Sequence, residues 1–240
     1  MVKIVLILFF SQMVYSQELF HYFEDYRLKQ SQITTEMASG FYAYESQPWQ
    51  NGIVPVEFDR SISKDYRNRF MAACKVWSDV ANVRCRLRKS TDIKYLFVTD
   101  KNNRCWTDVG SGSGRQEFNF SFDWCWEKTK LIHELGHVFG FMHEHQRPDR
   151  DKYLKVNLAN AGEYAFAYEK LSFGSLDKST PYDFMSIMHY WNAAYSVNGR
   201  PIMVPRPGYE KYTNTMGTSK SLTKGDRDLV RRVYGLKPSE

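Results

Sequence analysis

Residues 133–144 read His-Glu-Leu-Gly-His-Val-Phe-Gly-Phe-Met-His-Glu, and the rest of the chain is best interpreted from this stretch. Residues four apart lie on one face of a helix, so the imidazoles of His133 and His137 can bind one metal ion from consecutive turns. Glu134 lies beside them. A catalytic zinc ion has three protein ligands and one water, so with three histidine ligands Glu134 need not bind the metal and can polarise the metal-bound water. The stretch therefore predicts a helix that carries a catalytic zinc site.

The third nitrogen ligand comes from beyond the end of that helix. Gly140 can take the left-handed conformation that ends a helix, which allows His143 to turn back toward the same ion. The alternative is a helix whose histidines only lie at the edge of a core. With His at ~2%, Glu at ~6% and Gly at ~7% of residues, a chance match at all five positions has a probability on the order of 10⁻⁵. The pattern therefore favours one Zn²⁺ per chain.

The full pattern, H-E-x-x-H-x-x-G-x-x-H, is the metzincin signature, and the residues after it narrow the resemblance. The run from His133 to Asp151 resembles the astacin branch of the metzincins, which adds a Glu after the third His, here Glu144, and the motif R-x-D-R-D. The sequence Ser-Ile-Met-His-Tyr at 186–190 is similar to the Met-turn of that branch. The resemblance covers about residues 49–234, which is the whole expected catalytic domain.

This resemblance implies roles for individual residues. Met188 would lie beneath the zinc site, and Tyr190 would be a weak, displaceable fifth ligand that also stabilises the transition state. Glu144 would lie near the N-terminus that maturation releases. With Glu134 carrying a proton from water to the leaving amine, these roles imply a zinc-dependent endopeptidase that acts on proteins or peptides.

Two other functions remain open from the sequence. One is a secreted binding protein that keeps the zinc scaffold without turnover, and none of the matched chemical residues supports it. The other is a zinc hydrolase whose substrate is not a peptide. Residues 105–110 resemble the astacin segment that forms the sheet edge above the cleft, where a peptide could pair as an extra strand, and this argues against the second alternative.

The elements expected around the zinc helix follow from apolar periodicity. Pro55 favours an edge strand or the start of a strand. Strands are expected at 53–58, 85–87, 95–98 and 118–122, a helix over 64–82, and a terminal helix capped by Thr223. The resemblance implies an α+β fold of the metzincin type. Its N-terminal half would hold a twisted, mostly parallel five-stranded sheet with a backing helix and the zinc helix, and its irregular C-terminal half would hold the Met-turn and the terminal helix.

Composition sets broad limits on domain count and partners. The 240 residues, 42% of them apolar and 16% aromatic, suit one folded catalytic unit, which we expect to be a monomer. The formal charge of +6 comes from basic residues without a run of five or more Lys or Arg. No nucleic-acid-binding signature accompanies that charge, so a nucleic acid partner is not expected.

The N-terminus predicts secretion. Lys3 precedes an apolar run over 4–10 and a small-residue cleavage site that ends at Ser16, so residues 1–16 are interpreted as a signal peptide. An N-terminal anchor is the alternative, but the run is far shorter than the ~20 residues that span a bilayer, and no other such run occurs. A secreted, extracellular protein without a membrane span is therefore expected.

Residues 17–47 are interpreted as a short pro-segment before a catalytic domain at 48–240. Astacins are typically made as zymogens in which an Asp within F-x-G-D reaches the zinc. This chain has only Phe-Glu-Asp at 23–25, so Asp25 is a candidate for that blocking carboxylate without the full motif. A constitutively active enzyme or a chaperone-type leader is the alternative.

The four cysteines form a disulfide framework in an oxidising compartment. The resemblance implies a bond between Cys105 and Cys125. Cys85 also matches a family cysteine, but the usual partner near residues 235–237 is absent, so a bond between Cys74 and Cys85 is favoured. Two free buried thiols remain the alternative, and no C-x-x-C pair supports a cysteine zinc site.

Overall fold

The computed structural model describes residues 20–23, 26–29, 47–101, 103–171 and 180–236. The signal-peptide prediction for residues 1–16, the blocking role of Asp25 and most of the expected pro-segment lie outside these residues. Among the helices in the described part, none has the length and hydrophobicity needed to cross a bilayer.

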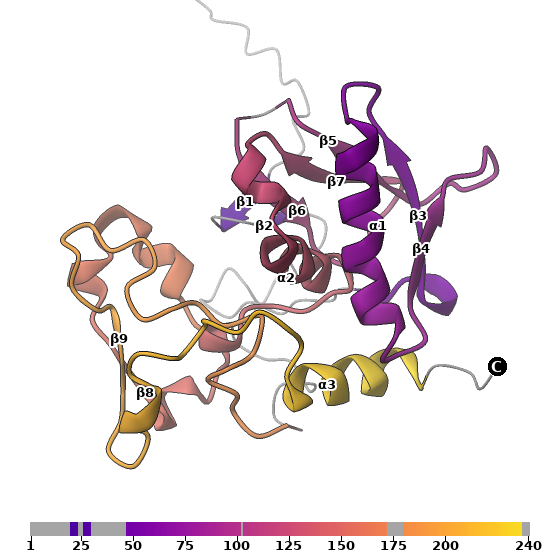
Figure 1. Ribbon diagram of the computed structural model, residues 1–240. Coiled ribbons are helices and arrows are strands. Elements are labelled where there is room, and N and C mark those ends of the chain that lie inside the picture. Colours follow the sequence, from indigo (N-terminus) through magenta and orange to yellow (C-terminus); the bar gives the residue numbers. More distant parts are fainter. Residues whose placement is uncertain (1–19, 24–25, 30–46, 102, 172–179, 237–240) are drawn as a thin grey trace, which may run out of the picture.

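A mixed sheet forms the N-terminal half (Figure 1). Its strand order is β1-β2-β6-β7-β5-β3-β4, in which β3 pairs in parallel with β4 and β5, β5 pairs in parallel with β7, and β6 runs antiparallel to β7. The five strands expected from the sequence are β3 (Ile53–Phe58), β4 (Arg84–Leu87), β5 (Tyr95–Thr99), β6 (Cys105–Asp108) and β7 (Arg115–Phe120). The predicted mostly parallel sheet is therefore confirmed.

Two further strands extend this sheet beyond β6. The hairpin of β1 (Phe20–Phe23) and β2 (Tyr26–Lys29) lies within the expected pro-segment, for which the sequence analysis named no strand. β2 pairs in parallel with β6, with Tyr26 opposite Thr107 and Arg27 opposite Asp108. The expected edge strand β6 is thus covered on its outer side by residues from the predicted pro-segment.

Two helices, α1 (Lys64–Ser78) and α2 (Lys128–Val138), cover one face of the sheet (Figure 1). The buried side chains of α1 recur at helical spacing, namely Phe70, Ala73, Cys74 and Trp77. Alternate strand residues such as Val54 and Val56 of β3 meet this layer and are fully buried. Removal of such side chains from water contributes about 1.5–3 kcal/mol each, and α1 in turn packs against α2.

Pro55 lies in an interior strand, and the expectation of an edge or a strand start was wrong. The Arg88 N–H donates to the Val56 carbonyl, so Val56 directs its backbone groups toward β4 and Pro55 directs its nitrogen toward β5. Pairing with β5 begins only at Val56, opposite Leu96. The missing N–H of Pro55 therefore interrupts no ladder.

The C-terminal half has little regular structure, as expected. It contains the short antiparallel pair β8 (Leu154–Val156) and β9 (Met203–Pro205), several 3-10 turns and the terminal helix α3 (Lys224–Tyr234), which Thr223 caps. α3 returns to the N-terminal half, where the Tyr234 hydroxyl donates to the Phe139 carbonyl at 2.9 Å. This contact ties the last helix to the end of α2.

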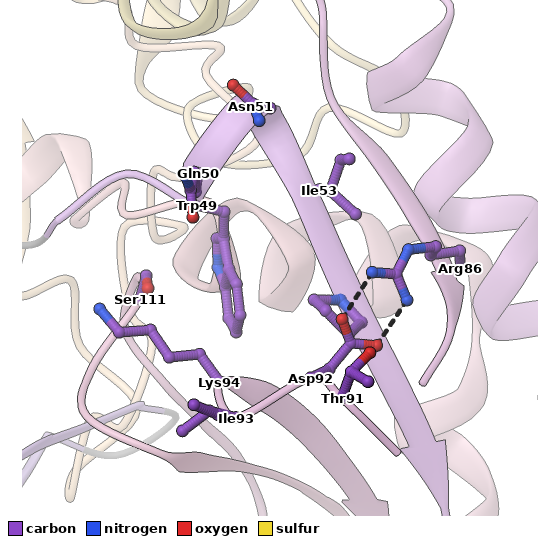
Figure 2. Close-up of a pocket in the computed structure, with 11 residues that line it drawn as sticks. Trp49, Gln50, Asn51, Ile53, Arg86, Thr91, Asp92, Ile93, Lys94 and Ser111 are labelled. Atoms are coloured by element: carbon purple, nitrogen blue, oxygen red, sulfur yellow. Dashed lines mark hydrogen bonds and ion pairs between the residues drawn. The ribbon is translucent and has the colours of Figure 1, made fainter. Parts of the chain in front are cut away.

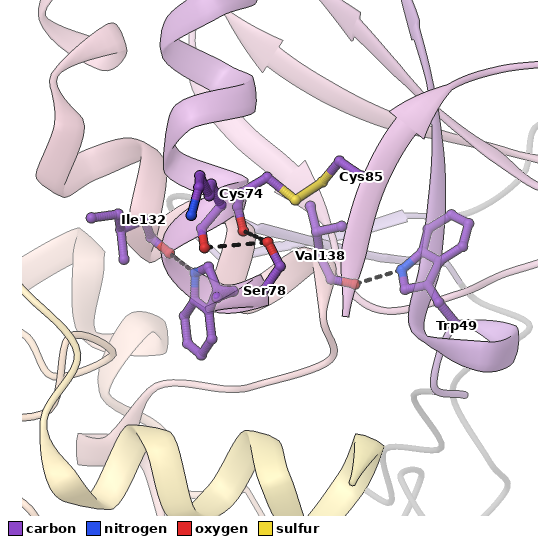
Figure 3. The surroundings of a disulfide bond; sticks show 8 residues. Trp49, Cys74, Ser78, Cys85, Ile132 and Val138 are labelled. Atoms are coloured by element: carbon purple, nitrogen blue, oxygen red, sulfur yellow. Dashed lines mark hydrogen bonds between the residues drawn. A yellow bond between two sulfur atoms is a disulfide. The ribbon is translucent and has the colours of Figure 1, made fainter. Parts of the chain in front are cut away.

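All four cysteines form disulfides. Cys74 of α1 is joined to Cys85 of β4, with their Cα atoms 6.2 Å apart, and Figure 3 shows this bond between helix and strand. Cys105 at the start of β6 is joined to Cys125 just before α2, with Cα atoms 6.0 Å apart. The structure therefore has both of the pairings that the sequence analysis favoured, and no free thiol.

Candidate zinc and catalytic centre

Three imidazoles converge at the C-terminal end of α2. Nε2 of His143 lies 3.2 Å from Nε2 of His137 and 3.3 Å from Nε2 of His133. Within the described ranges, these three residues are the one group of three or more His, Cys, Asp or Glu side chains placed to hold a metal ion. The structure thus brings together the three predicted ligands.

Gly140 ends the helix as expected and allows the third ligand to return. Its φ of +95° is left-handed, its N–H donates to the His137 carbonyl at 2.8 Å, and the Phe141 N–H donates to the Gly136 carbonyl at 3.0 Å. These two bonds form a Schellman motif. The chain then runs extended through His143, whose ring faces the helix it has just left.

Hydrogen bonds on the far side of each ring determine which nitrogen is available to a metal. Nδ1 of His133 donates to the Ile187 carbonyl at 2.7 Å, Nδ1 of His137 donates to the Phe141 carbonyl at 2.7 Å, and Nδ1 of His143 donates to Oε1 of Gln146 at 3.1 Å. Because every partner is an acceptor, each Nδ1 carries the proton and each Nε2 presents a lone pair. Three lone pairs this close repel one another unless a cation binds between them, so the donor set fits Zn²⁺.

Glu134 lies on α2 between the first two ligands and is fully buried. Nζ of Lys130, one helical turn earlier, lies 2.9 Å from its Oε1, and the Lys130 side chain is 26% exposed. The sequence analysis did not single out Lys130. Its signal was present as an opposite charge at i,i+4 on the zinc helix, a spacing at which two side chains meet.

The predicted Met-turn lies directly beneath this helix. Met188 is buried, and a Cβ atom built on Gly136 would lie 2.3 Å from its Sδ. The carbonyl of Met188 accepts from the Glu144 N–H at 2.9 Å. The segment that follows the third ligand is therefore bonded to the Met-turn.

Asp226 of α3 holds the Met-turn from the opposite side, and the sequence analysis missed it. Its carboxylate accepts from the Ser186 hydroxyl at 2.6 Å and from the Ile187 N–H at 3.0 Å. It also accepts from the Thr223 N–H at 2.9 Å within the capping box of α3. Burial raises the pKa of Asp226, which these hydrogen bonds oppose. Only the capping pattern of Thr223 and Asp226 is visible in the sequence.

Tyr190 is buried next to the third ligand. Its ring centroid lies 4.3 Å from that of His143 and 4.4 Å from that of His145, on which it stacks. Burial lowers the pKa of His145 well below its ordinary value and lowers the pKa of His189 to about 4. The imidazole of His145, on which Tyr190 stacks, is therefore neutral near pH 7.

Glu144 links the zinc motif to the segment before the Met-turn. Its Oε1 accepts from Nη1 of Arg147 and from the backbone N–H of Asp183, both at 2.9 Å. Arg147 also binds the carboxylate of Asp149 and the carbonyl of Thr180. The R-x-D-R-D motif therefore serves here as a brace. The approach of a mature N-terminus to Glu144 stays a prediction.

A cavity of about 560 Å³ opens beside the histidines. Its lining includes Lys130, His133 and Tyr190, together with the aromatic residues Trp124, Trp191 and Tyr195. Trp124 and Trp191 are more than half exposed, so large apolar rings line the cavity at the surface. The cavity joins His133, one of the three predicted zinc ligands, and Tyr190 to the surface and can admit a side chain of a bound peptide.

Comparisons with known proteins agree with this geometry. A family model described as Astacin, a peptidase family, matches residues 41–235. The chain is 30% identical to zinc metalloproteinase nas-14 of Caenorhabditis elegans, over 82% of this chain and 39% of that protein. It is 33% identical to the dorsal-ventral patterning protein tolloid of Drosophila melanogaster, over 79% of this chain and 18% of that protein. The chain thus spans less than half the length of these relatives.

A solved structure extends the comparison to the fold. High choriolytic enzyme 1, a hatching enzyme zinc-protease from Oryzias latipes, matches with a TM-score of 0.71 at 25% identity. The match covers 82% of this chain and 98% of that one. This chain therefore shares its α+β arrangement with nearly the whole length of that zinc-protease.

Proposed function

The chain belongs to the astacin family, and from that membership we propose that it is a zinc-dependent endopeptidase that hydrolyses internal peptide bonds of proteins. The observation that carries the proposal is the convergence of three Nε2 lone pairs beside a buried carboxylate at the wall of a cavity. A binding protein without turnover would need the ligands but not Glu134.

Each residue of the centre has a separate task in this proposal. His133, His137 and His143 would hold Zn²⁺, which when bound supplies the Lewis acidity that makes water a nucleophile near pH 7. Glu134 takes the proton of the attacking water and passes it to the leaving amine. Tyr190 donates its hydroxyl hydrogen to the oxyanion that develops on the attacked carbonyl. The role of Tyr190 as a weak fifth ligand belongs to the same proposal.

The Lys130 contact suggests how Glu134 is oriented. The ammonium group binds Oε1 of Glu134 from the side of the cavity, which restrains the rotation of a carboxylate that has no exposed surface. The second oxygen can then accept the proton of the water. In this arrangement Lys130 positions the base and does not itself move a proton.

Peptidase activity is tested with the chain from residue 48 onward, folded with both disulfides. We expect about one zinc per chain, cleavage of a denatured protein within its sequence, loss of cleavage with a chelator and recovery when zinc is restored. A protein that binds zinc but cleaves no protein substrate would support the binding-protein alternative. Hydrolysis of esters alone would support a zinc hydrolase with a different substrate.

We further propose that residues 17–47 keep the enzyme latent until they are removed. The support is the pairing of β2 with β6, because a strand on that edge occupies the place where an extended peptide substrate would pair. The chain from residue 17 should therefore cleave peptides with a kcat/KM at least about 10-fold below that of the chain from residue 48. Equal activity of the two forms would refute latency.

Secretion is proposed from the predicted leader at 1–16 and from the two disulfides. Both Cys74–Cys85 and Cys105–Cys125 link separate elements of the sheet-and-helix half, and such bonds form and persist in oxidising compartments. When the full chain is expressed in a secreting cell, the protein recovered from the culture medium should begin at residue 17 or later. Retention of residues 1–16 on a membrane-associated product would contradict this proposal.

A further inference from the structure

The positive charge of the chain is concentrated in one short segment. Residues 84–104 contain seven Lys or Arg and two Asp, a net charge of +5, whereas the whole chain has +6. The other residues hold 26 Lys or Arg and 25 Asp or Glu and are nearly neutral. The sequence contains no long basic run because the cations alternate with other residues. In a strand, such alternation places the cations on one face.

The alternation places three arginines on the outer face of an edge strand. Arg84, Arg86 and Arg88 follow one another at every second position along β4 and its extension, so their side chains leave the sheet on the same side. Cys85 lies between the first two and turns inward to α1 (Figure 3). The Cα atoms of these arginines are therefore roughly 6–7 Å apart along the strand, and their side chains leave it on the face that the helices do not cover.

Two of these arginines are fixed in place. Arg86 makes a bidentate ion pair with Asp92, at 2.6 and 2.7 Å. Arg88 pairs with Glu57 and stacks over the ring of Tyr95, with its guanidinium carbon 3.5 Å from the ring centroid. These contacts order the surface and partly neutralise it.

The remaining charge of the surface is free to bind a partner. Arg84, Lys89 and Lys94 are exposed, and their side chains form no ion pair with any residue that the structure describes. Lys89 and Lys94 both belong to the turn between β4 and β5, next to Arg86 and Arg88. The five cations together form what we call the β4 surface: Arg84, Arg86, Arg88, Lys89 and Lys94.

Two shallow hollows flank this turn. The first, of about 520 Å³, is lined by Arg86 and Lys94 as well as Trp49, and Figure 2 shows the Lys94 side chain extending along it with Arg86 at the other end. The second, of about 500 Å³, is lined by Arg88 and Lys89. Neither shares a lining residue with the cavity beside the zinc ligands. A chain-like ligand could therefore lie across both hollows while the catalytic cavity stays open.

From these observations we propose that the β4 surface binds a sulfated polysaccharide. An extended polyanion matches a row of regularly spaced cations, and its binding releases counterions, which makes the affinity fall with salt. β4, the strand that carries this surface, is joined to α1 on its inner side by the Cys74–Cys85 disulfide, so the surface is built under oxidising conditions, in which acidic polysaccharides rather than nucleic acids are the expected polyanions. Such binding would hold the protein on a matrix, and it does not depend on the proposed peptidase activity.

The experiment measures binding of the folded chain from residue 48 to heparin, a sulfated polysaccharide, over a series of NaCl concentrations. The test variant Arg84→Ser/Lys89→Ser/Lys94→Ser removes one Arg and two Lys from the β4 surface. The control variant Arg200→Ser/Lys155→Ser/Lys220→Ser removes the same charges from exposed positions elsewhere. Zinc content and circular dichroism of all three proteins verify the fold.

We expect the test variant to bind heparin at least about 10-fold more weakly than the parent chain, with a salt slope lower by about 2 to 3. The control variant should stay within about 2-fold of the parent, because its lost charges lie outside the surface. If the two variants lose the same heparin affinity, binding depends only on the net charge of the chain, and the proposal is overturned. Absence of heparin binding by the parent at about 0.15 M NaCl, or equal affinity for desulfated heparin or duplex DNA, would also overturn it.

Discussion

A Cβ atom on Gly136 would lie 2.3 Å from Sδ of Met188, so the zinc helix and the Met-turn meet where only a hydrogen atom fits. Cζ2 of Trp77 closes the same space at 3.2 Å. We therefore expect Gly136→Ala to displace Met188 and to lower the free energy of unfolding by about 1–3 kcal/mol, measured by denaturant titration. Zinc should also bind more weakly, since His133 and His137 flank the substituted position.

The matched control for that substitution is a double-mutant cycle with Met188→Ala. Removing the Met188 side chain makes room for the new methyl group, so Gly136→Ala should cost less in the Met188→Ala background than in the parent chain. Additive losses would show that the two residues do not interact and that Gly136 is needed for another reason.

The zinc site could be predicted from the sequence because its geometry is local. Helical spacing places His133 and His137 on one face, and a left-handed glycine at position 140 is enough to return His143 to them. The apolar runs of β3 and β5 and the alternating phenylalanines of β7 likewise indicate strands that a core buries.

The contacts that could not be predicted join segments far apart in the chain. Asp226 binds Ser186 and Ile187 across about 40 residues, and nothing in the local sequence around either segment indicates that they meet. The strands of the β1–β2 hairpin have only four residues each, and the pairing of β2 with β6 depends on backbone groups that every sequence has. Tertiary contacts of this kind outweigh local propensity.

Glu134→Gln separates metal capture from proton transfer. The amide keeps the size of the buried side chain but cannot accept the proton of the attacking water, so kcat should fall by about 10²–10⁴-fold while zinc content stays near one per chain. Glu127→Gln is the matched control, because it removes a carboxylate that lines the same cavity without lying between zinc ligands. Turnover close to that of the parent chain in Glu134→Gln would exclude Glu134 as the base.

Asp226→Asn tests the brace between α3 and the Met-turn. The amide oxygen can still accept from the backbone N–H groups of Ile187 and Thr223, but it is an uncharged acceptor, and the amide NH2 group replaces the oxygen that accepts from the Ser186 hydroxyl. We therefore expect a loss of about 1–3 kcal/mol in the free energy of unfolding. Asp228→Asn, two residues later on the exposed side of α3, should leave the free energy of unfolding nearly unchanged, because exposed ion pairs contribute little. Equal effects of the two substitutions in thermal or denaturant unfolding would show that the Asp226 bonds add no stability.

Tyr190→Phe tests whether the tyrosine beside the third ligand acts in the transition state. The substitution removes one hydroxyl and keeps the ring, so the contacts with His143 and His145 and the fold should survive. Because three histidines hold the ion, zinc content and KM should change little. Loss of a preorganised oxyanion donor should lower kcat by about 10- to 1,000-fold. If Tyr190 only packs against the histidines, kcat will equal that of the parent chain with zinc intact, and measuring kcat, KM and bound zinc on one preparation distinguishes the two roles.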